Sequence, residues 1–271
     1  MVTDDITLTG DLLGCNIGLV VGKSNITIDG AGHTLSGNCA NPANCGATYG
    51  YGVQLYNYDG VTIKNLVIKG FGGGVSLYQT EGSTIRDNAI IDSNIAVRVA
   101  GAESEKNIII NNDFKHNHQA IRLVFDTHDN TIISNNIYDT IANAINIDSN
   151  GNQIEKNYLS GNAWGISLYD SDDNLILNNR ILNTRGDAIK LTNHSSTNTI
   201  LRNTVKYSRN GYYTDFLSES NHFINNKSFY SDEYGMWDET GGGTGTAGTD
   251  NFYSNNKCKS DVDSMPAGLC K

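Results

Sequence analysis

Short apolar runs separated by asparagine and glycine recur along most of the chain. Residues 150–195 contain the pattern twice, as NGNQIEKNYLSGNAWGISLYDS and DDNLILNNRILNTRGDAIKLTNHS. In each copy an anchoring asparagine is followed by an isoleucine two residues later and by a second asparagine five residues later. The anchors, Asn152 and Asn174, lie 22 residues apart, and their partners are Asn157 and Asn179. A fixed period of this length indicates a protein built from stacked repeats.

The same pattern extends in both directions from this pair. Further anchors are Ser83, Asn107, Asn130, Asn198, Asn221 and Asn251. Successive anchors lie 24, 23, 22, 22, 24, 23 and 30 residues apart. The longer final interval contains the glycine–threonine stretch Gly241–Gly248, which we expect to form a surface loop.

The apolar runs are too short for helices. Each repeat contains several β-branched runs of three to five residues, and helical periodicity over ten or more residues is absent. Leucine-rich repeats have a similar period, but they require a leucine lattice that these repeats lack. Three short strands per turn, joined by tight corners, predict an all-β parallel β-helix of roughly ten coils with about 22–24 residues each. At a strand spacing of about 4.8 Å, ten coils give a rod about 48 Å long.

Composition fits tight corners and stacked side chains. The chain has 36 asparagines and 29 glycines but only 2 prolines, and asparagine and glycine tolerate left-handed backbone conformations. We expect isoleucine, valine and leucine to point inward. The asparagine five residues after each anchor is expected to stack on its counterparts, with its amide bonded to the corner backbone and to its neighbour.

We expect a single domain over residues 1–271. Residues 1–24 would form an N-terminal cap, residues 25–240 the coils, and residues 241–271 a glycine-rich loop, the last coil and a disulfide-clipped tail. The five cysteines lie only near the ends of the chain, at Cys15, Cys39, Cys45, Cys258 and Cys270. This clustering favours disulfide bonds at the ends of the rod, and therefore an oxidising compartment. The pairing among the first three stays open, as does the alternative of buried thiols.

Charge and hydropathy exclude several classes of partner. The net charge of −10 argues against a nucleic-acid backbone, which would require a basic surface. The chain has no run of 18 apolar residues, so we expect no membrane insertion. The first residues show no basic segment followed by an apolar run, and no signal peptide is expected among them. We expect a monomer that is secreted, periplasmic or at the cell surface.

Two of the repeats and both ends carry a family resemblance. NQIEKNYLSGNAWGISLYDS, NLILNNRILNTRGDAIKLTN, the opening TLTGDLLGCNIGLVVGKSNITIDGAGHTLSG and the closing NFYSNNKCKSDVDSMPAGLCK resemble NosD-like right-handed parallel β-helix proteins. Their pectate-lyase-like superfamily includes lyases, uronan epimerases, accessory periplasmic proteins and adhesins. The resemblance therefore implies the fold more specifically than the function. The Asp-Pro-His signature of mannuronan epimerases does not occur in the chain.

In a β-helix the inward positions form the core, so chemistry must lie on outward positions. Alternation along the longest runs predicts two outward rows on one face. The first row is Gln54, Ser76, Arg98, Arg122, Asn146, Ser167, Lys190 and Thr214, and the second is Tyr56, Tyr78, Ala100, Val124, Asp148, Tyr169 and Thr192. This stripe brings basic and aromatic residues together in an acidic protein. An ordinary solvated strand surface is the alternative.

We expect this stripe to hold an extended, acidic polysaccharide. The residues expected to bind it are Tyr56, Tyr78, Arg98, Asn146, Asp148, Trp164 and Lys190. Arginine and lysine would neutralise sugar carboxylates, and aromatic rings would stack on the apolar faces of sugar rings.

The segment from Asp113 to Asp129 supplies candidate catalytic groups. It holds three of the six histidines. His118 precedes the run that carries Arg122, so an imidazole could move a proton beside a guanidinium that stabilises developing negative charge. With Tyr169 as the other proton-transfer candidate, these residues would support lyase or epimerase chemistry on a uronic acid. Histidines in solvated turns are the alternative.

A turn with three acidic residues is a candidate calcium site. Asp170, Asp172 and Asp173 offer carboxylate oxygens of the kind calcium prefers. An ordinary solvated turn explains the same residues.

The leading hypothesis is therefore a carbohydrate-active β-helix protein, which as an enzyme would be a polysaccharide lyase or uronan epimerase. Two alternatives remain. One is a non-catalytic surface protein, adhesin or structural spacer. The other, which the family resemblance suggests, is an accessory protein in periplasmic metal-site assembly.

Overall fold

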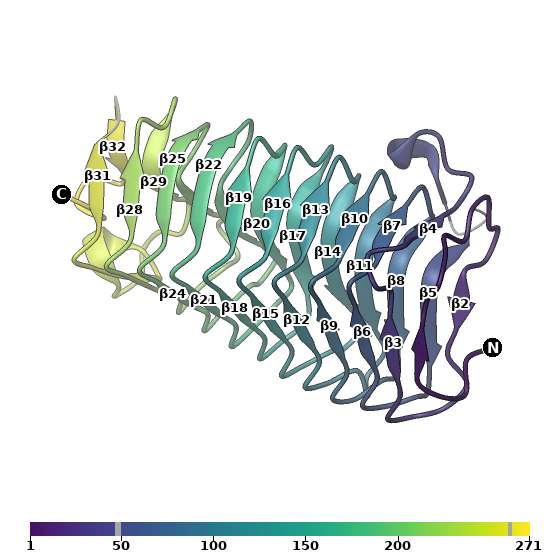
Figure 1. Ribbon diagram of the computed structural model, residues 1–271. Helices are drawn as coiled ribbons and strands as arrows, with labels where there is room; N and C mark the ends of the chain where they lie inside the picture. Colours follow the sequence, from purple (N-terminus) through teal and green to yellow (C-terminus); the bar gives the residue numbers. More distant parts are fainter. Residues whose placement is uncertain (47–49, 260–261) are drawn as a thin grey trace.

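The chain winds into a right-handed parallel β-helix of about ten coils with about 23 residues per coil. The computed structural model describes residues 1–46, 50–259 and 262–271. Figure 1 shows a rod with the two termini at opposite ends. The predicted fold class is confirmed.

Three parallel sheets run along the rod, and each coil after the first contributes one strand to each sheet. Sheet 1 consists of β1 (Ile6–Thr7), β3 (Thr27–Asp29), β6 (Thr62–Lys64), β9 (Thr84–Arg86), β12 (Ile108–Ile110), β15 (Thr131–Ile133), β18 (Gln153–Glu155), β21 (Leu175–Leu177), β24 (Thr199–Leu201), β27 (His222–Ile224) and β30 (Phe252–Ser254). Sheet 2 consists of β4 (Thr34–Ser36), β7 (Val67–Lys69), β10 (Ala89–Ile91), β13 (Asp113–Lys115), β16 (Asn136–Tyr138), β19 (Tyr158–Ser160), β22 (Arg180–Thr184), β25 (Thr204–Ser208), β28 (Lys227–Phe229) and β31 (Lys257–Lys259).

Sheet 3 has the longest strands and carries most of the residues expected to be functional. It consists of β2 (Leu19–Val20), β5 (Tyr51–Tyr56), β8 (Gly73–Tyr78), β11 (Ile95–Ala100), β14 (Gln119–Val124), β17 (Asn143–Asp148), β20 (Trp164–Tyr169), β23 (Ile189–Thr192), β26 (Tyr212–Thr214), β29 (Tyr234–Asp238) and β32 (Val262–Met265). In the described part of the chain, the 3-10 helices η1 (Pro42–Asn44) and η3 (Thr246–Gly248) lie in loops. Among the described residues, no helix is long and apolar enough to cross a membrane.

The core is a set of apolar stacks along the axis of the rod. In sheet 1 the middle residue of each three-residue strand is buried and pairs with its equivalents in the neighbouring coils. The stack in the middle of the rod is Ile85, Ile109, Ile132, Ile154, Ile176 and Ile200. Because side chains alternate along a strand, a three-residue strand points its middle side chain inward.

The corner between sheets 1 and 2 requires a left-handed residue in every coil. The residues with positive φ at this corner include Asn65, Asp87, Asn111, Ser134, Lys156, Asn178, Arg202, Asn225 and Asn255. Asparagine and aspartate tolerate this conformation better than most residues. Asparagine therefore has two roles at this corner. It adopts the left-handed conformation, and the residue that follows along the chain is usually a second, buried asparagine.

That buried asparagine makes hydrogen bonds in both directions along the rod. Asn157 Nδ2 donates to Ile132 O at 2.9 Å and to Asn179 Oδ1 at 3.0 Å. Asn157 Oδ1 in turn accepts from the backbone N and the side-chain Nδ2 of Asn135, at 2.9 and 3.0 Å. The predicted stack of asparagines is confirmed.

The anchoring asparagines form a second stack that the sequence did not lead us to expect. Asn152 N donates to Asn174 Oδ1 at 2.8 Å, and Asn174 Nδ2 donates to Ser149 O at 3.0 Å. Like the first stack, these side chains are buried. Two corners of each coil are thus tied to the next coil by amide groups.

The ends of the chain extend the sheets. In the segment predicted as a cap, residues 1–24, β1 pairs with β3 and β2 pairs with β5. Disulfides join Cys39 to Cys45 and Cys258 to Cys270, and Cys15 takes part in neither. Disulfides near the ends of the rod were expected, and they are typical of proteins in an oxidising compartment.

Substitution of a stacked asparagine should be costly. Asn157→Ala leaves the backbone N–H of Asn135 and the carbonyl of Ile132 buried without these partners. We expect the free energy of unfolding to fall by about 2–5 kcal/mol, measured by chemical denaturation. Asn136→Ala is the control, since its amide bonds only to Asp113 on the exposed face, at 2.7 Å. A loss below about 0.5 kcal/mol is expected there, and equal losses would contradict the role of the stack.

Stability should also depend on Asp29, at the end of β3. The Asn65 side chain, the Ala31 backbone N–H and Lys64 lower the pKa of Asp29 to about 2. A carboxyl with a lowered pKa in the folded state stabilises the protein above its unfolded pKa of about 4, and this contribution is lost as the pH falls towards 2. We expect Asp29→Asn to lower the melting temperature at pH 6, with the difference from the native protein shrinking between pH 4 and pH 2. A difference independent of pH would contradict this assignment.

Candidate functional site

The outer face of sheet 3 contains a groove of about 350 Å³ that crosses four consecutive coils. We call it the sheet 3 groove. Its lining residues, from β14, β17, β20 and β23, are Gln119, Arg122, Asn143, Asn146, Asp148, Ser167, Tyr169, Lys190 and Thr192. The strand register aligns Arg122 with Asn146, Asn146 with Ser167, and Ser167 with Lys190. Residues distant in the sequence are therefore neighbours at steps of about 4.8 Å.

Hydrogen bonds between side chains hold the floor of the groove in place. Arg122 Nη2 lies 3.3 Å from Asp148 Oδ2, and Asn146 Nδ2 donates to Asp148 Oδ1 at 2.8 Å. Asn143 Nδ2 donates to Asn146 Oδ1 at 3.0 Å, and Ser167 Oγ donates to Asn143 Oδ1 at 3.1 Å. The network fixes the guanidinium of Arg122 in one orientation before any ligand arrives.

Two polar atoms at one end of this network are buried and unpaired. Arg122 Nε and Gln119 Oε1 have no hydrogen-bond partner among the described residues. Buried polar atoms are almost always paired, and each such exception needs an explanation. Here one donor and one acceptor lie on the same strand, and both belong to residues that line the groove. Because both atoms are buried, a ligand reaches them only after the neighbouring side chains move.

Aromatic and basic side chains flank the groove. Lys190 Nζ lies 5.6 Å from the centre of the Trp164 ring, and the side chain of Trp164 is 40% exposed. One coil towards the N-terminus, Arg98 lies over Phe125 at 5.5 Å. Farther along the same face the rings of Tyr56 and Tyr78 stack at 5.0 Å. The outer face of sheet 3 therefore combines cations with exposed ring faces.

The structure brings together five of the residues predicted to be functional. Arg122, Asn146, Asp148, Tyr169 and Lys190 all line the sheet 3 groove. Trp164 contacts Lys190 at its edge, and Arg98, Tyr56 and Tyr78 lie on coils nearer the N-terminus. Half-buried His118 precedes β14 and is not among the groove-lining residues. Its proposed role in proton transfer remains a prediction.

The predicted outward rows differ from the structure at three positions, since Ala100 and Val124 in the second row are buried and Thr214 in the first row points inward. Thr214 is buried and pairs with Leu191, whereas Tyr213 pairs with Lys190 and continues the outward row. The reason is Tyr212, whose ring is buried in the core and whose hydroxyl donates to Asn203 O at 3.0 Å. Tyr213 donates to Glu239 at 2.8 Å, and burial together with Glu239 raises the pKa of Tyr213.

Gln119 and Asn143 were not anticipated because alternation breaks near the start of each strand in sheet 3. Ala120 and Ala144, the residues that follow them, are fully buried, as are the next residues, Ile121 and Ile145. Two inward positions in succession leave the preceding residue facing outward. In the sequence, the small residue immediately before the first inward isoleucine, Ala120 or Ala144, could have indicated this break in alternation.

The acidic turn gives the calcium hypothesis no geometric support. Asp172 Oδ1 accepts from the backbone N of Ser196 at 2.8 Å, and Asp170 and Asp173 adopt positive φ angles as corner residues do. In the described part of the chain, the three ligand atoms that approach within 4.8 Å of one another belong instead to Glu105, His128 and Asp129. Calcium binding at the turn stays a prediction.

Comparison with known families gives a match over most of the chain. The model of the family described as "Periplasmic copper-binding protein (NosD)" matches residues 24–258. The chain belongs to the NosD family. A search among curated protein sequences finds no match.

Solved structures of carbohydrate enzymes have the same fold as this NosD family member. DFA-IIIase from Arthrobacter chlorophenolicus A6 without its lid superimposes with a TM-score of 0.69 at 10% identity, covering 91% of this chain and 71% of that chain. The periplasmic alginate epimerase AlgG superimposes with a TM-score of 0.65 at 15% identity, covering 91% of this chain and 63% of the epimerase. At such low identity these similarities establish the fold alone.

Proposed function

We propose that this NosD family member binds an acidic polysaccharide in the sheet 3 groove. The observation that supports this most strongly is Arg122, a partly exposed guanidinium that contacts Asp148 and lines the groove. An arginine held in this way matches a carboxylate, because its planar donors bind the two oxygens at once. Lys190, three coils away in the same groove, supplies a second positive charge for a sugar farther along the polysaccharide.

The shape and the flanks of the groove favour a chain of sugars over a small anion. The groove crosses four coils, so it is about 14 Å long along the rod. Trp164 offers an exposed ring beside Lys190, and a pyranose can pack its apolar face on such a ring. The stacked Tyr56 and Tyr78 would extend the surface for a longer ligand.

Lyase and epimerase activities on a uronic acid would both begin in the same way at this site. A base removes the proton on the carbon next to the sugar carboxylate, and Arg122 stabilises the negative charge that develops on the carboxylate oxygens. Tyr169 lies in the groove with a largely exposed side chain and is the better placed proton-transfer group. A lyase then expels the oxygen at the next carbon, and an epimerase returns the proton to the opposite face.

The structural neighbours support a carbohydrate ligand for this fold. The epimerase AlgG acts on alginate, and DFA-IIIase has been crystallised in complex with DFA-III. The NosD description and the two disulfides support a periplasmic or other extracytoplasmic location.

An accessory role in copper-site assembly is the second candidate, and the description of the family favours it. The scarcity of sulfur ligands in this protein argues against a copper-assembly role. Copper(I) prefers thiolate and thioether ligands, whereas the chain has only 3 methionines, and four of its five cysteines are in disulfides. A non-catalytic spacer or adhesin remains the alternative if no reaction is found.

Binding should depend on Arg122. We expect polygalacturonate or alginate to bind the native protein in calorimetry, and Arg122→Ala to weaken binding roughly 10- to 100-fold, the value of a charge-assisted hydrogen bond. Arg180→Ala is the matched control, since Arg180 lies on sheet 2 over Tyr158 and should leave binding unchanged. Equal affinity of all three proteins would contradict the proposed groove.

Catalysis is tested separately with the same polysaccharides. Ultraviolet absorbance reports the unsaturated uronide that a lyase makes, and proton exchange from solvent reports an epimerase. We expect one of the two signals, reduced at least tenfold in Tyr169→Phe if Tyr169 transfers the proton. Binding without either signal, with and without calcium, would leave the groove as a binding site and exclude both enzyme activities.

A further inference from the structure

A cluster of three metal-binding residue types lies outside the sheet 3 groove, between sheets 3 and 1. Glu105 and His128 occupy equivalent positions on adjacent coils and form a parallel bridge through their backbones. Each lies two residues before a stacked asparagine, Asn107 or Asn130, and Asn107 N donates to Asn130 Oδ1 at 3.0 Å. The backbone beneath the cluster is therefore held by the same amide stack as the rest of the rod.

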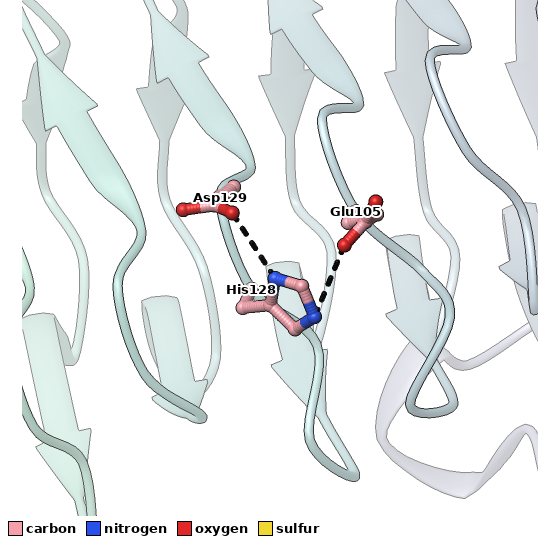
Figure 2. A group of neighbouring side chains, drawn as sticks. All are labelled: Glu105, His128 and Asp129. Carbon is pink, nitrogen blue, oxygen red and sulfur yellow. Dashed lines mark hydrogen bonds and ion pairs between the residues drawn. The ribbon is translucent and has the colours of Figure 1, made fainter.

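The side chains of the cluster point toward one another (Figure 2). His128 Nε2 lies 3.1 Å from Glu105 Oε2, and His128 Nδ1 lies 3.2 Å from Asp129 Oδ2. One ligand atom from each residue lies within 4.8 Å of the other two. Ligands bound at about 2.1 Å in a tetrahedral site are about 3.4 Å apart, and one ion takes a single imidazole nitrogen. Glu105 and Asp129 face different nitrogens of His128, so binding requires the Asp129 side chain, which is 60% exposed, to rotate towards the nitrogen that faces Glu105.

A cavity of about 390 Å³ lies next to these ligands and is strongly acidic. Asp59, Glu81 and Glu103 line it together with Glu105 and His128. Lys106 is paired with both Glu81 and Glu105, at 2.8 and 2.7 Å, so it offsets only part of this negative charge. An acidic concave surface raises the local concentration of cations and leaves room for water to complete a coordination sphere.

We propose that Glu105, His128 and Asp129 bind a divalent transition-metal ion of the Zn²⁺ type. One imidazole and two carboxylates suit zinc and its neighbours in the first transition series. Calcium and magnesium prefer all-oxygen sites, and copper(I) prefers sulfur, which this site does not contain. Three protein ligands leave a fourth position open, as in exchangeable and catalytic zinc sites.

This site is independent of the sheet 3 groove. No described residue lines both the groove and the acidic cavity. It also differs from the copper binding in the family description, because its donors are nitrogen and oxygen only.

The chain contains a natural control for the proposed site. His116 also lies between two carboxylates, those of Asp92 and Asp139 on the neighbouring coils, but at longer distances of 4.0 and 3.7 Å. It also combines one imidazole with two carboxylates, yet its ligand atoms do not converge as those around His128 do. Comparing the two histidines separates a metal site from an acidic surface.

The test is calorimetric titration of the metal-free full-length protein with Zn²⁺, alongside His128→Gln, Glu105→Gln and His116→Gln. We expect one saturable Zn²⁺ ion per native chain, weakened about 100-fold or more by His128→Gln and by a smaller factor in Glu105→Gln. His116→Gln should bind as the native protein does. Co²⁺ should give visible absorption bands that disappear in His128→Gln, and circular dichroism should show that all four proteins are folded.

Two results would overturn the proposal. Native protein without saturable Zn²⁺ binding would leave Glu105, His128 and Asp129 as an ion-pair cluster that links adjacent coils. Equal loss of affinity in His128→Gln and His116→Gln would assign the ion to the acidic surface as a whole.

Discussion

The hydrogen bond from an asparagine amide to the next coil is the constraint on which this structure depends. The three-residue strands of sheet 1 have few backbone hydrogen bonds per strand with which to fix their register. Asn157 adds a bond to the backbone of Ile132 and shares its oxygen with Asn135, so a slip of one residue would break several buried bonds at once. The same arrangement recurs in coil after coil, and the isoleucine stacks follow from it.

Because the register between coils is fixed, the number of residues between two positions in the sequence determines whether their side chains are neighbours on the surface. Residues 22 to 24 apart become neighbours, which is how Arg122, Asn146 and Lys190 come to line one groove although no two share a strand. The same rule places His128 beside Glu105. Because the interior of the rod is fully used by apolar and amide stacks, outward rows of this kind are where chemistry can differ between members of the fold.

The parts of the structure that repeat could be predicted, and the parts that depart from the repeat could not. The period and the Asn157–Asn179 spacing were sufficient for the fold and for the stripe that contains Arg122 and Lys190. The outward position of Tyr213 was missed because Tyr212, a tyrosine, occupies the inward position that isoleucine holds in the neighbouring coil. Gln119 was missed because strict alternation does not allow two inward residues in succession, which Ala120 and Ile121 are. The contact of His128 with Glu105 depends on side-chain conformations that no spacing rule contains, although both residues lie two positions before a stacked asparagine.

The central claim is that the outer face of sheet 3 holds an acidic polysaccharide through Arg122. A crystal structure of the protein with a bound oligouronide tests it most directly. The expected result is a sugar carboxylate within hydrogen-bond distance of the Arg122 guanidinium, a second one near Lys190, and a sugar ring packed on Trp164. A well-ordered oligouronide bound to sheet 1 or sheet 2, with no contact to Arg122, would contradict the claim.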